Sequence, residues 1–400
     1  MKLIRRSNYI NRIKPFIDKP IIKILVGMRR VGKSTLLQQI SKEILGHIEE
    51  DNKIYINFES FEFSEISDAK DLFSYIKSRV GNNEDKFYLF FDEIQLIKNW
   101  ERAINALRVN FNCDIYITVS NSSLLSGDLS TLLAGRYVEF EIKPFSFLEF
   151  RDLYADLKLT DKDLFNKYLQ FGGMPVLKYF NFEEDPGFKY LRDVYHTVIV
   201  KDVLSYHNIR DVDLFKRILA FTIENMGHTF SANSIKNYLK NESIKVSVDT
   251  VINYLEMCRQ AFILDKVSRY DCVGKRILKV DEKYFINDHG FREAVGFSNI
   301  RDIERTLENI VYNELKSRSY DVNIGKVNEH EIDFIASKNK EIEYYQVAYL
   351  LESEKTRESE FGVYKNISDN FPKYVLSMDE NDFSQNGIRH KNVIRFLMGE

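Results

Sequence analysis

The sequence predicts an α/β fold built on a parallel sheet and followed by helical and mixed modules. Five strand-like segments alternate with helical segments in the first 142 residues, which is typical of a parallel sheet covered by helices on both faces. A glycine-flanked loop separates the first strand from the first helix. At 400 residues the chain exceeds the size of one hydrophobic core, so we expect several domains.

The composition is typical of a folded protein of a reducing compartment. Apolar residues make up 44% of the chain and charged residues 29%, so long disordered tracts are not expected. The formal net charge of −3 excludes a uniformly basic protein, and any nucleic-acid surface must be a local patch. Cys113, Cys258 and Cys272 have no metal-ligand spacing, and no apolar run has the length of a signal-peptide core or a membrane span. We expect a cytoplasmic protein with no membrane partner.

The predicted strands and helices alternate from residue 21 onward. The first strand covers residues 21–26 and is followed by the glycine loop and a helix, the order that a phosphate-binding P-loop requires. A further helix is predicted over residues 98–109. The remaining strand-like segments are 53–59, 86–93, 114–120 and 136–142.

The loop GMRRVGKS matches the pattern G-x-x-x-x-G-K-[ST] at every required position. In such a loop the backbone N–H groups surround the phosphates, Lys33 supplies positive charge to the β- and γ-phosphates, and the Ser34 hydroxyl binds Mg²⁺. We therefore expect ATP and Mg²⁺ as cofactors. The predicted nucleotide-binding residues of the loop are Gly27, Arg29, Arg30, Val31, Gly32, Lys33, Ser34 and Thr35.

Two carboxylates at the end of a buried strand supply the second half of the site. In the segment FYLFFDEIQ, Asp92 is placed to hold Mg²⁺ and Glu93 to orient or deprotonate the attacking water. An extra strand, 53–59, lies between the loop and these carboxylates along the chain, and Glu directly follows Asp. Both features indicate the additional-strand branch of P-loop proteins, in which hydrolysis is expected.

Further polar residues end the later strands of this region. Ser120 and Asn121 are placed to sense the γ-phosphate, although a strand-end turn equally uses Ser and Asn. Arg136 is a candidate arginine finger for the γ-phosphate of its own subunit or of a neighbouring subunit in a homo-oligomer, with Arg29 and Arg30 as rivals.

The pattern changes after residue 150, where we divide the chain into three further segments. Residues 151–226 read as a helical lid and connector, entered through a capping box at Ser146 and Glu149 and interrupted by a tight turn in FGGMPVLKYF. Residues 227–282 have the order of a winged helix-turn-helix: two short helices, a longer helix and two strands. Residues 283–400 read as a helix, three strands, a helix and a strand.

The whole chain resembles a widespread prokaryotic family of AAA-type ATPases with a C-terminal, endonuclease-like domain of unknown function. This resemblance implies an AAA-type P-loop NTPase with a helical lid, a winged helix and a restriction-endonuclease-like α/β domain. The family usually has Gly where this chain has Val119. The matching stretches include GMRRVGKSTLL, FYLFFDEIQLIKNWE, SNSSLLSGDLSTLLAGRYVEFEIKPFSFLEF, FGGMPVLKYF, VIVKDVLSYHNI and EIDFIA.

The endonuclease resemblance implies a helix Glu, a strand Asp and an E-x-K on the next strand, arranged around Mg²⁺. Glu308 and Asp333 occupy the first two positions, but the third reads Gln346, Val347, Ala348. A neutral amide is a poor Mg²⁺ ligand, and alanine stabilises no developing charge. Lys338 or Lys340 is a candidate substitute for the lysine, and otherwise the domain is a degenerate nuclease that binds nucleic acid or protein.

The predicted winged helix has its positive charge on the wing. Its recognition helix, 247–260, carries Asp249 and Glu256 against Arg259. The basic residues Lys266, Arg269, Lys275, Arg276 and Lys279 surround Gly274, which is typical of a DNA-binding wing. A winged helix that only packs beside the ATPase is the alternative.

Three functions remain open at this point. The first is a Mg²⁺-dependent ATPase that rearranges the winged helix and the nuclease-like domain on DNA, through Lys275, Arg276 and Lys279. The second is an ATP-dependent signalling switch with a protein partner and no DNA. The third is an ATP-gated nuclease that uses Asp333.

Overall fold

The computed structural model describes residues 3–400 except 123–132, 208, 273, 275 and 368, and of residues 277–281 it describes only the backbone. The chain divides into two compact units. Unit 1 comprises Met1–Lys143 and Gln260–Phe262, and unit 2 comprises Pro144–Arg259 and Ile263–Glu400.

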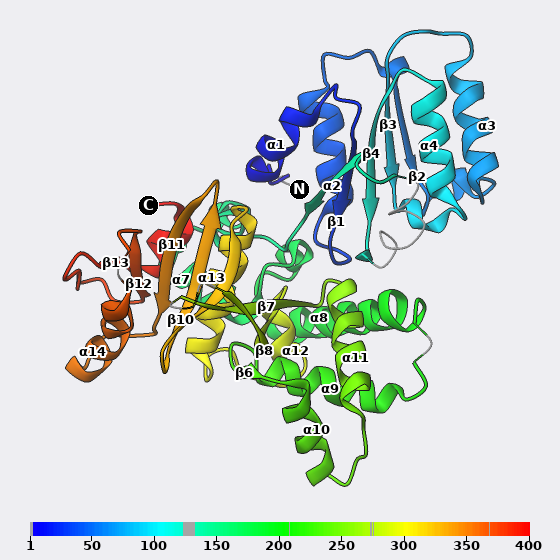
Figure 1. The fold of residues 1–400 in the computed structure, drawn as a ribbon. Helices are drawn as coiled ribbons and strands as arrows, with labels where there is room; N and C mark the ends of the chain where they lie inside the picture. The colour runs from blue at the N-terminus through cyan, green and yellow to red at the C-terminus, as the bar shows by residue number, and fades with distance from the viewer. Residues whose placement is uncertain (1–2, 123–132, 208, 273, 275, 368) are drawn as a thin grey trace. The chain divides into compact units, whose positions relative to one another are not determined.

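Unit 1 contains a parallel sheet with the order β2-β3-β4-β1-β5 among the described residues. Helices α1 and α2 lie on one face, and α3 and α4 cover the other (Figure 1). The strands are β1 (Ile22–Val26), β2 (Lys53–Asn57), β3 (Phe87–Asp92), β4 (Cys113–Val119) and β5 (Tyr137–Glu141). The helices are α1 (Ser7–Ile13), α2 (Lys33–Gln39), α3 (Ala69–Val80) and α4 (Trp100–Asn110). The predicted P-loop α/β fold is confirmed.

The strand order explains where the apolar runs lie. Strands β1 and β3 are buried at every position, as expected for parallel strands covered on both faces. The strand that separates them in space is β4, which pairs with both. The segment 53–59, the extra strand along the chain, forms β2 at the edge of the sheet. The strand that lies between β1 and β3 in space is therefore β4, which comes after the carboxylate pair in the sequence.

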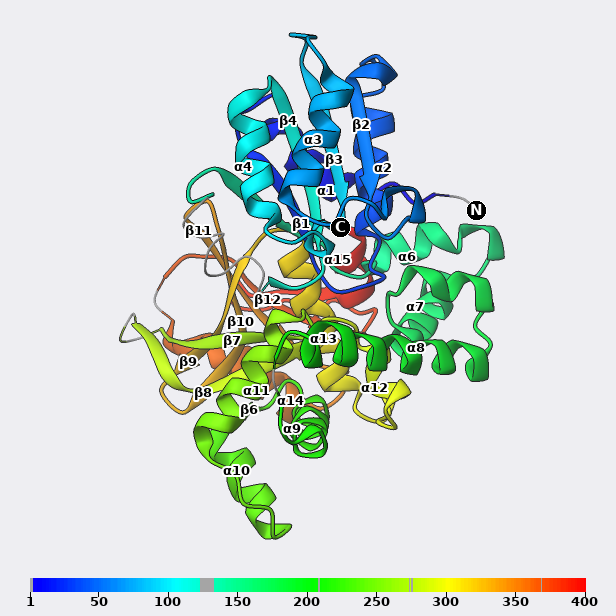
Figure 2. The same cartoon turned by 90° about the vertical axis from the view of Figure 1, so that its right-hand side faces the viewer.

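Unit 2 contains most of the helices and a larger mixed sheet. Helices α6 and α7 pack on each other, and α12 packs on α7 and α8 (Figure 2). The first helices are α6 (Phe147–Leu153), α7 (Asp161–Phe171), α8 (Glu184–Val198), α9 (Val212–Glu224), α10 (Ala232–Asn241) and α11 (Val248–Gln260). The later ones are α12 (Gly290–Ala294), α13 (Ile303–Ser317), α14 (Glu354–Gly362) and α15 (Val393–Met398).

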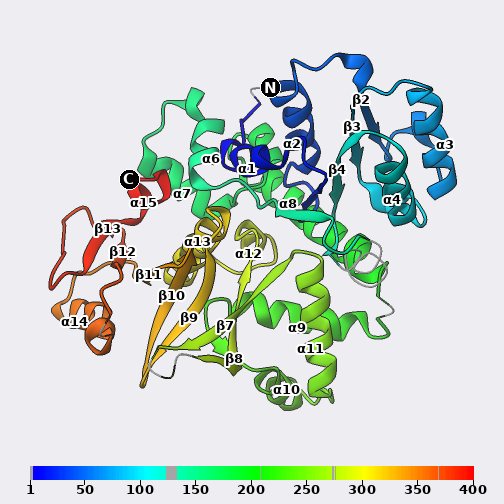
Figure 3. The same ribbon diagram turned by 45° about the horizontal axis from the view of Figure 1, so that its top comes forward.

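The sheet of unit 2 contains strands from both sides of the predicted boundary at residue 282. Its order among the described residues is β13-β12-β11-β10-β9-β7-β8-β6, and β7 pairs in parallel with β9 (Figure 3). The predicted boundary at residue 282 lies inside β8, and the boundary at 226 lies inside unit 2. The strands are β6 (Thr229–Phe230), β7 (Leu264–Asp271), β8 (Arg276–Ile286), β9 (Asp321–Val327), β10 (His330–Lys338), β11 (Glu341–Val347), β12 (Lys373–Ser377) and β13 (Arg389–Asn392).

The glycine pair of FGGMPVLKYF connects distant parts of unit 2. The N–H of Gly173 donates to Asp288 Oδ2 at 3.0 Å, and its carbonyl accepts from the N–H of Phe145 at 2.8 Å. Gly172 has φ +77°, and a Cβ there would lie 2.0 Å from Asp288 Oδ1. Only glycine fits this contact without displacement. The predicted tight turn therefore binds the start of unit 2 to residues near α12.

The capping box predicted at the entry to α6 is confirmed, because Ser146 Oγ and the Glu149 carboxylate each accept from the other residue's N–H. Among the described residues, no helix is both long and apolar enough to cross a membrane.

Candidate nucleotide site

The phosphate loop takes its shape from glycines at two positions. Gly27 has φ +144°, and a Cβ there would lie 2.4 Å from the carbonyl oxygen of Ile142. Gly32 has φ +99° and caps the amino end of α2 in a left-handed conformation. The loop therefore ends at a helix N-terminus, where backbone N–H groups and the helix dipole favour an anion.

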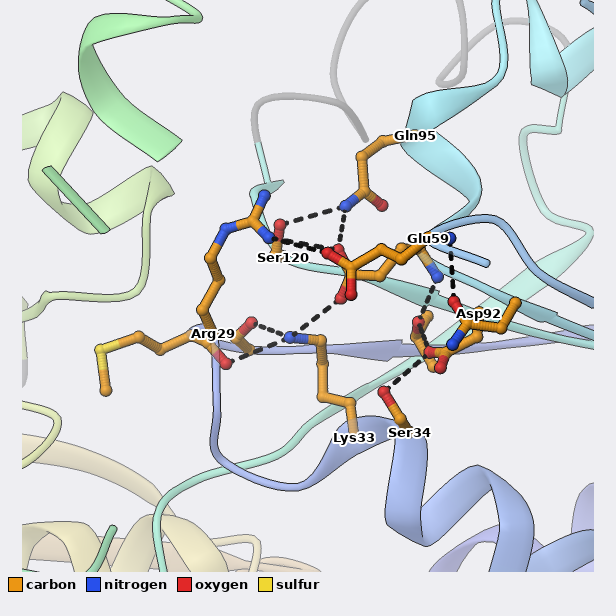
Figure 4. Close-up of polar contacts among 12 residues, drawn as sticks. Arg29, Lys33, Ser34, Glu59, Asp92, Gln95 and Ser120 are labelled. Carbon is orange, nitrogen blue, oxygen red and sulfur yellow. Dashed lines mark hydrogen bonds and ion pairs between the residues drawn. The ribbon is translucent and has the colours of Figure 1, made fainter. Parts of the chain in front are cut away.

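Lys33 projects from the first turn of α2 back across the loop (Figure 4). Its Nζ donates to the carbonyls of Gly27 at 2.8 Å and Met28 at 3.1 Å, and lies 3.9 Å from Glu93 Oε1. The side chain is only 3% exposed. This arrangement concentrates positive charge inside the loop, where the phosphates of a nucleotide are expected.

Asp92 ends β3 beside the loop. Its Oδ1 accepts hydrogen bonds from Ser34 Oγ at 3.0 Å and Thr118 Oγ1 at 2.6 Å. Burial raises the pKa of Asp92 above its ordinary value, against the lowering effect of these two hydrogen bonds. A hydroxyl and a carboxylate oxygen this close fit a hard divalent cation, and the cation would also stabilise the buried charge. The residues present therefore fit the expected Mg²⁺.

Glu93 follows Asp92 in an unusual backbone conformation. It has φ +56° and ψ +47°, a left-handed geometry that is strained for a non-glycine residue. Its N–H donates to Thr118 Oγ1 at 2.8 Å, which holds the strained peptide in place. The side chain is buried and accepts a hydrogen bond from Gln95 Nε2. The strain turns the carboxylate toward the loop and its lysine.

Arg29 brings a second cation from the loop to Glu93. Its Nη1 lies 3.8 Å from Glu93 Oε2 and 3.7 Å from Glu59 Oε1 (Figure 4). Gln95 Nε2 also donates to Ser120 Oγ at 3.2 Å. Sequence reasoning did not single out Thr118, Gln95 or Glu59. For Gln95 a signal was present, because it stands two residues after Glu93 in the quoted segment DEIQ.

The other predicted loop residues lie around this centre. Val31 is fully buried, while Arg30 is exposed and has φ +69°. Thr35 is half-buried in α2, and Asn121 is buried just after β4. Their contacts with nucleotide stay predictions.

Arg136 lies at the edge of the sheet formed by the amino ends of the strands, whereas the phosphate loop lies at the edge formed by their carboxyl ends. It directly precedes β5, and its carbonyl accepts from the N–H of Ile22 at the start of β1. A strand of five residues, about 16 Å at 3.3 Å per residue, separates this edge from the loop. Its Nη1 donates to Asn105 Oδ1 at 3.1 Å. The predicted contact with the γ-phosphate of its own subunit therefore does not fit, and a role toward a neighbouring subunit stays a prediction.

Comparison with known proteins agrees with this geometry. A family model described as an AAA domain matches residues 19–151, and a model described as a domain of unknown function, DUF8612, matches residues 162–302. An uncharacterised protein of Haemophilus influenzae is 38% identical over 380 residues, which cover 94% of this chain and 93% of that protein. The chain belongs to this AAA-domain family.

More distant relatives of the AAA-domain chain extend to archaea. An uncharacterised protein of Methanocaldococcus jannaschii is 30% identical over 382 residues, 91% of this chain and 83% of that protein. The Walker-type ATPase PABY2304 of Pyrococcus abyssi has a similar structure, with a TM-score of 0.50 and 15% identity over 73% of this chain and 95% of that one. The AAA-type P-loop fold is thus shown by sequence and structure.

The AAA-domain chain has a second polar cluster, in unit 2. Lys283 of β8 places its Nζ 3.1 Å from Glu308 Oε2, 2.8 Å from Glu331 Oε1 and 3.9 Å from Asp333 Oδ1. The lysine side chain is 3% exposed. Burial raises the pKa of Glu308 to about 8 and that of Asp333 to about 6, although Lys283 lowers both. We name these four residues the Lys283 cluster.

The Lys283 cluster contains the endonuclease-like positions that the resemblance implied. Gln346 lies beside Asp333, since its Oε1 accepts from the Asp333 N–H at 3.2 Å. The amine comes from β8, because Lys338 instead donates to the carbonyl of Arg318 at 2.7 Å and Lys340 is exposed. Among the described residues, no group of three or more His, Cys, Asp and Glu side chains suits a metal ion. The candidate Lys338 therefore bonds elsewhere and the candidate Lys340 stays a prediction, whereas Lys283 supplies positive charge among the carboxylates.

The predicted basic wing is only partly described. Arg276 is 75% exposed and lies 3.8 Å from Asp271 Oδ2, whereas Lys266 pairs with Glu282 at 2.6 Å. Lys275 and the side chain of Lys279 lie outside the described residues. Arg276 is therefore the described member of the three predicted DNA contacts.

Proposed function

We propose that this AAA-domain protein binds ATP with Mg²⁺ and hydrolyses the bond between its β- and γ-phosphates. The observation that carries the proposal is the convergence of Lys33 and Ser34 from the loop with Asp92 and Glu93 from β3. A phosphate loop alone supports binding. A buried carboxylate beside the loop lysine, in addition to the one that fits Mg²⁺, supports hydrolysis.

Each residue has a distinct role in this proposal. Lys33 exchanges its hydrogen bonds to the loop carbonyls for the β- and γ-phosphates, and Ser34 and Asp92 hold the metal. Bound Mg²⁺ neutralises charge that develops on the phosphates. Glu93 accepts a proton from the attacking water, and its left-handed backbone keeps the carboxylate on the loop side of β3.

The test is steady-state ATP hydrolysis by wild type, Glu93→Gln and Lys33→Ala. Glu93→Gln is expected to bind ATP normally and to lose turnover by about 10² to 10⁴-fold, the usual contribution of a general base. Lys33→Ala is expected to lose binding. Glu62→Gln, an exposed carboxylate of the same unit, is the matched control. Full turnover by Glu93→Gln would refute the role of Glu93.

We further propose that the protein contacts DNA through a winged helix in unit 2. In this proposal, ATP turnover rearranges the winged helix on the DNA. The order α9, β6, α10, α11, β7, β8, with β8 paired to both β6 and β7, supports this domain type. Arg276 stands on the hairpin beyond Gly274 and is highly exposed. Charge reversal at Lys275 and Arg276 is expected to abolish DNA binding at low salt and any stimulation of ATPase activity by DNA.

A protein-partnered switch is the second candidate. The observation in its favour is α11, where Arg259 is neutralised by Glu256 through two hydrogen bonds and Asp249 is exposed. Such a helix offers little charge to a phosphate backbone. Slow turnover that is indifferent to DNA, and unchanged by reversal of Lys275 and Arg276, would favour this candidate.

The nuclease-like part is proposed to be degenerate. Lys283 occupies the centre of the carboxylates, and the third motif position offers Gln346 and Ala348. We expect no Mg²⁺-dependent cleavage of plasmid or single-stranded DNA. Cleavage that disappears in Asp333→Ala would overturn this assignment.

A further inference from the structure

Gln95 connects the residues that follow the carboxyl ends of β3 and β4 at the nucleotide site. It lies in η5 (Ile94–Leu96), a single turn of 3₁₀ helix that begins directly after Glu93. Its Nε2 donates to the Glu93 carboxylate and, at 3.2 Å, to Ser120 Oγ beyond β4 (Figure 4). One amide group therefore holds the carboxylate that follows β3 and the hydroxyl that follows β4.

The other described partners of the Glu93 carboxylate are cations of the phosphate loop. Arg29 lies 3.8 Å from Oε2 and Lys33 lies 3.9 Å from Oε1. Both distances exceed a hydrogen bond, and the negative phosphates of a bound nucleotide attract both cations. The neutral amide of Gln95 is much less affected by that charge, so it is the contact that can keep Glu93 oriented during turnover.

The second polar atom of Gln95 is left without a donor. Oε1 is buried, and no described residue donates a hydrogen bond to it. A buried acceptor without a donor is uncommon in a purely structural side chain and is typical of sites that take up water or ligand. The assignment of the amide follows from its neighbours, since the atom between the Glu93 carboxylate and the Ser120 hydroxyl must donate to the carboxylate.

We propose that Gln95 is a positioning residue for ATP hydrolysis, holding the Glu93 carboxylate and the Ser120 hydroxyl in one hydrogen-bonded unit. This inference rests on the proposed ATPase function. Gln95 acts through Glu93 and not on the phosphates, so its loss changes turnover and leaves nucleotide affinity unaltered. Through Gln95, the Ser120 hydroxyl is connected to Glu93, the proposed general base.

The test compares Gln95→Met, which keeps the length and removes both polar atoms, with Gln95→Glu, which keeps the shape and removes the donors. Both are expected to lower kcat by a factor on the order of 10 or more, while in Gln95→Met, which adds no charge, KM and the Kd for Mg²⁺·ATP change less than about twofold. Gln170→Met is the matched control, because Gln170 bonds to Glu184 in unit 2.

Coupling to Glu93 separates positioning from a general structural role. In Glu93→Asp the carboxylate is one methylene shorter, so adding Gln95→Met is expected to cost less than it does in the wild type. Thermal unfolding and the stoichiometry of ATP binding show whether each variant is folded. Wild-type kcat in both Gln95 variants, or equal costs in both backgrounds, would overturn the inference alone. An inactive wild type would overturn the proposed function and this inference together.

Discussion

The guanidinium of Arg6 donates a hydrogen bond to the carbonyl oxygen of Val31 at 3.0 Å. This bond holds the segment before α1 against the phosphate loop. A second N–H of Arg6 donates to the carbonyl of Lys143 at 2.9 Å. Arg6 is 2% exposed, and Lys143 is the last residue before unit 2 begins. One buried side chain thus joins the nucleotide loop to the segment that leaves unit 1.

The first prediction concerns this arginine. Arg6→Met fills the space but leaves the Val31 and Lys143 carbonyls without these donors, which we expect to lower the free energy of unfolding by about 1–3 kcal/mol. The loop is expected to lose order and the Kd for Mg²⁺·ATP to rise. Urea denaturation and ATP titration check both effects. Arg5→Met, at a side chain that is 61% exposed, is the control, and an equal effect there would contradict the prediction.

The second prediction concerns Thr118, whose hydroxyl contacts the Asp92 carboxylate and the Glu93 backbone N–H. Thr118→Val keeps the shape but removes the donor to Asp92 and the acceptor for the N–H of Glu93. We expect a loss of about 1–3 kcal/mol in unfolding free energy and a kcat at least tenfold lower. Steady-state kinetics and urea denaturation measure the two. An unchanged kcat would show that the strained peptide of Glu93 does not depend on this hydroxyl.

The third prediction concerns the charge at the centre of the Lys283 cluster. Lys283→Met leaves Glu308, Glu331 and Asp333 without their shared cation, and breaking a buried pair in this way costs about 3–5 kcal/mol. The loss is expected to be larger at pH 8 than at pH 5, because burial raises the pKa of Glu308 and Asp333 and both are neutralised by protonation at the lower pH. Lys338→Met, which loses a bond to the Arg318 carbonyl and a cation–π contact with Tyr320 at an exposed position, is the control for denaturation at both pH values.

The fourth prediction concerns the pH dependence of stability. Burial raises the pKa of Glu308 from 4.5 to about 8, so the folded protein binds the proton more tightly than the unfolded chain. The contribution of this group to stability is present below about pH 4.5 and is lost as the pH rises toward 8. Glu308→Gln is expected to flatten the fall in Tm between pH 5 and 8. Glu329→Gln, at an exposed position, is expected to keep the wild-type profile.

The sequence was most informative where a short motif carries its own geometry. The loop and Asp92 were predictable because their spacing and the strand before each are local features of the chain. Thr118 was not predictable as a partner of Asp92, because it depends on β4 lying beside β3. The position of Arg136 follows from the register of β5 against β1, which local sequence does not encode.

Lys283 was missed for a related reason. It lies in β8, a strand that begins in the predicted winged-helix segment and crosses the predicted boundary at residue 282, whereas Glu308 and Asp333 lie well inside the predicted endonuclease-like segment. The parallel pairing of β7 with β9 brings these segments into one sheet and places the amine among the carboxylates. No pattern within either segment indicates that pairing.

The β7–β9 pairing also limits how the chain can be divided or recombined. A fragment that stops at residue 282 would cut β8 and remove β9, and β7 would then present a row of unpaired N–H and C=O groups. Such an edge recruits strands from other molecules and promotes aggregation. The helix pair before β7 and the strands after α13 therefore cannot be exchanged separately between homologues, and we expect gene fusions and truncations in this family to keep residues 144–400 together.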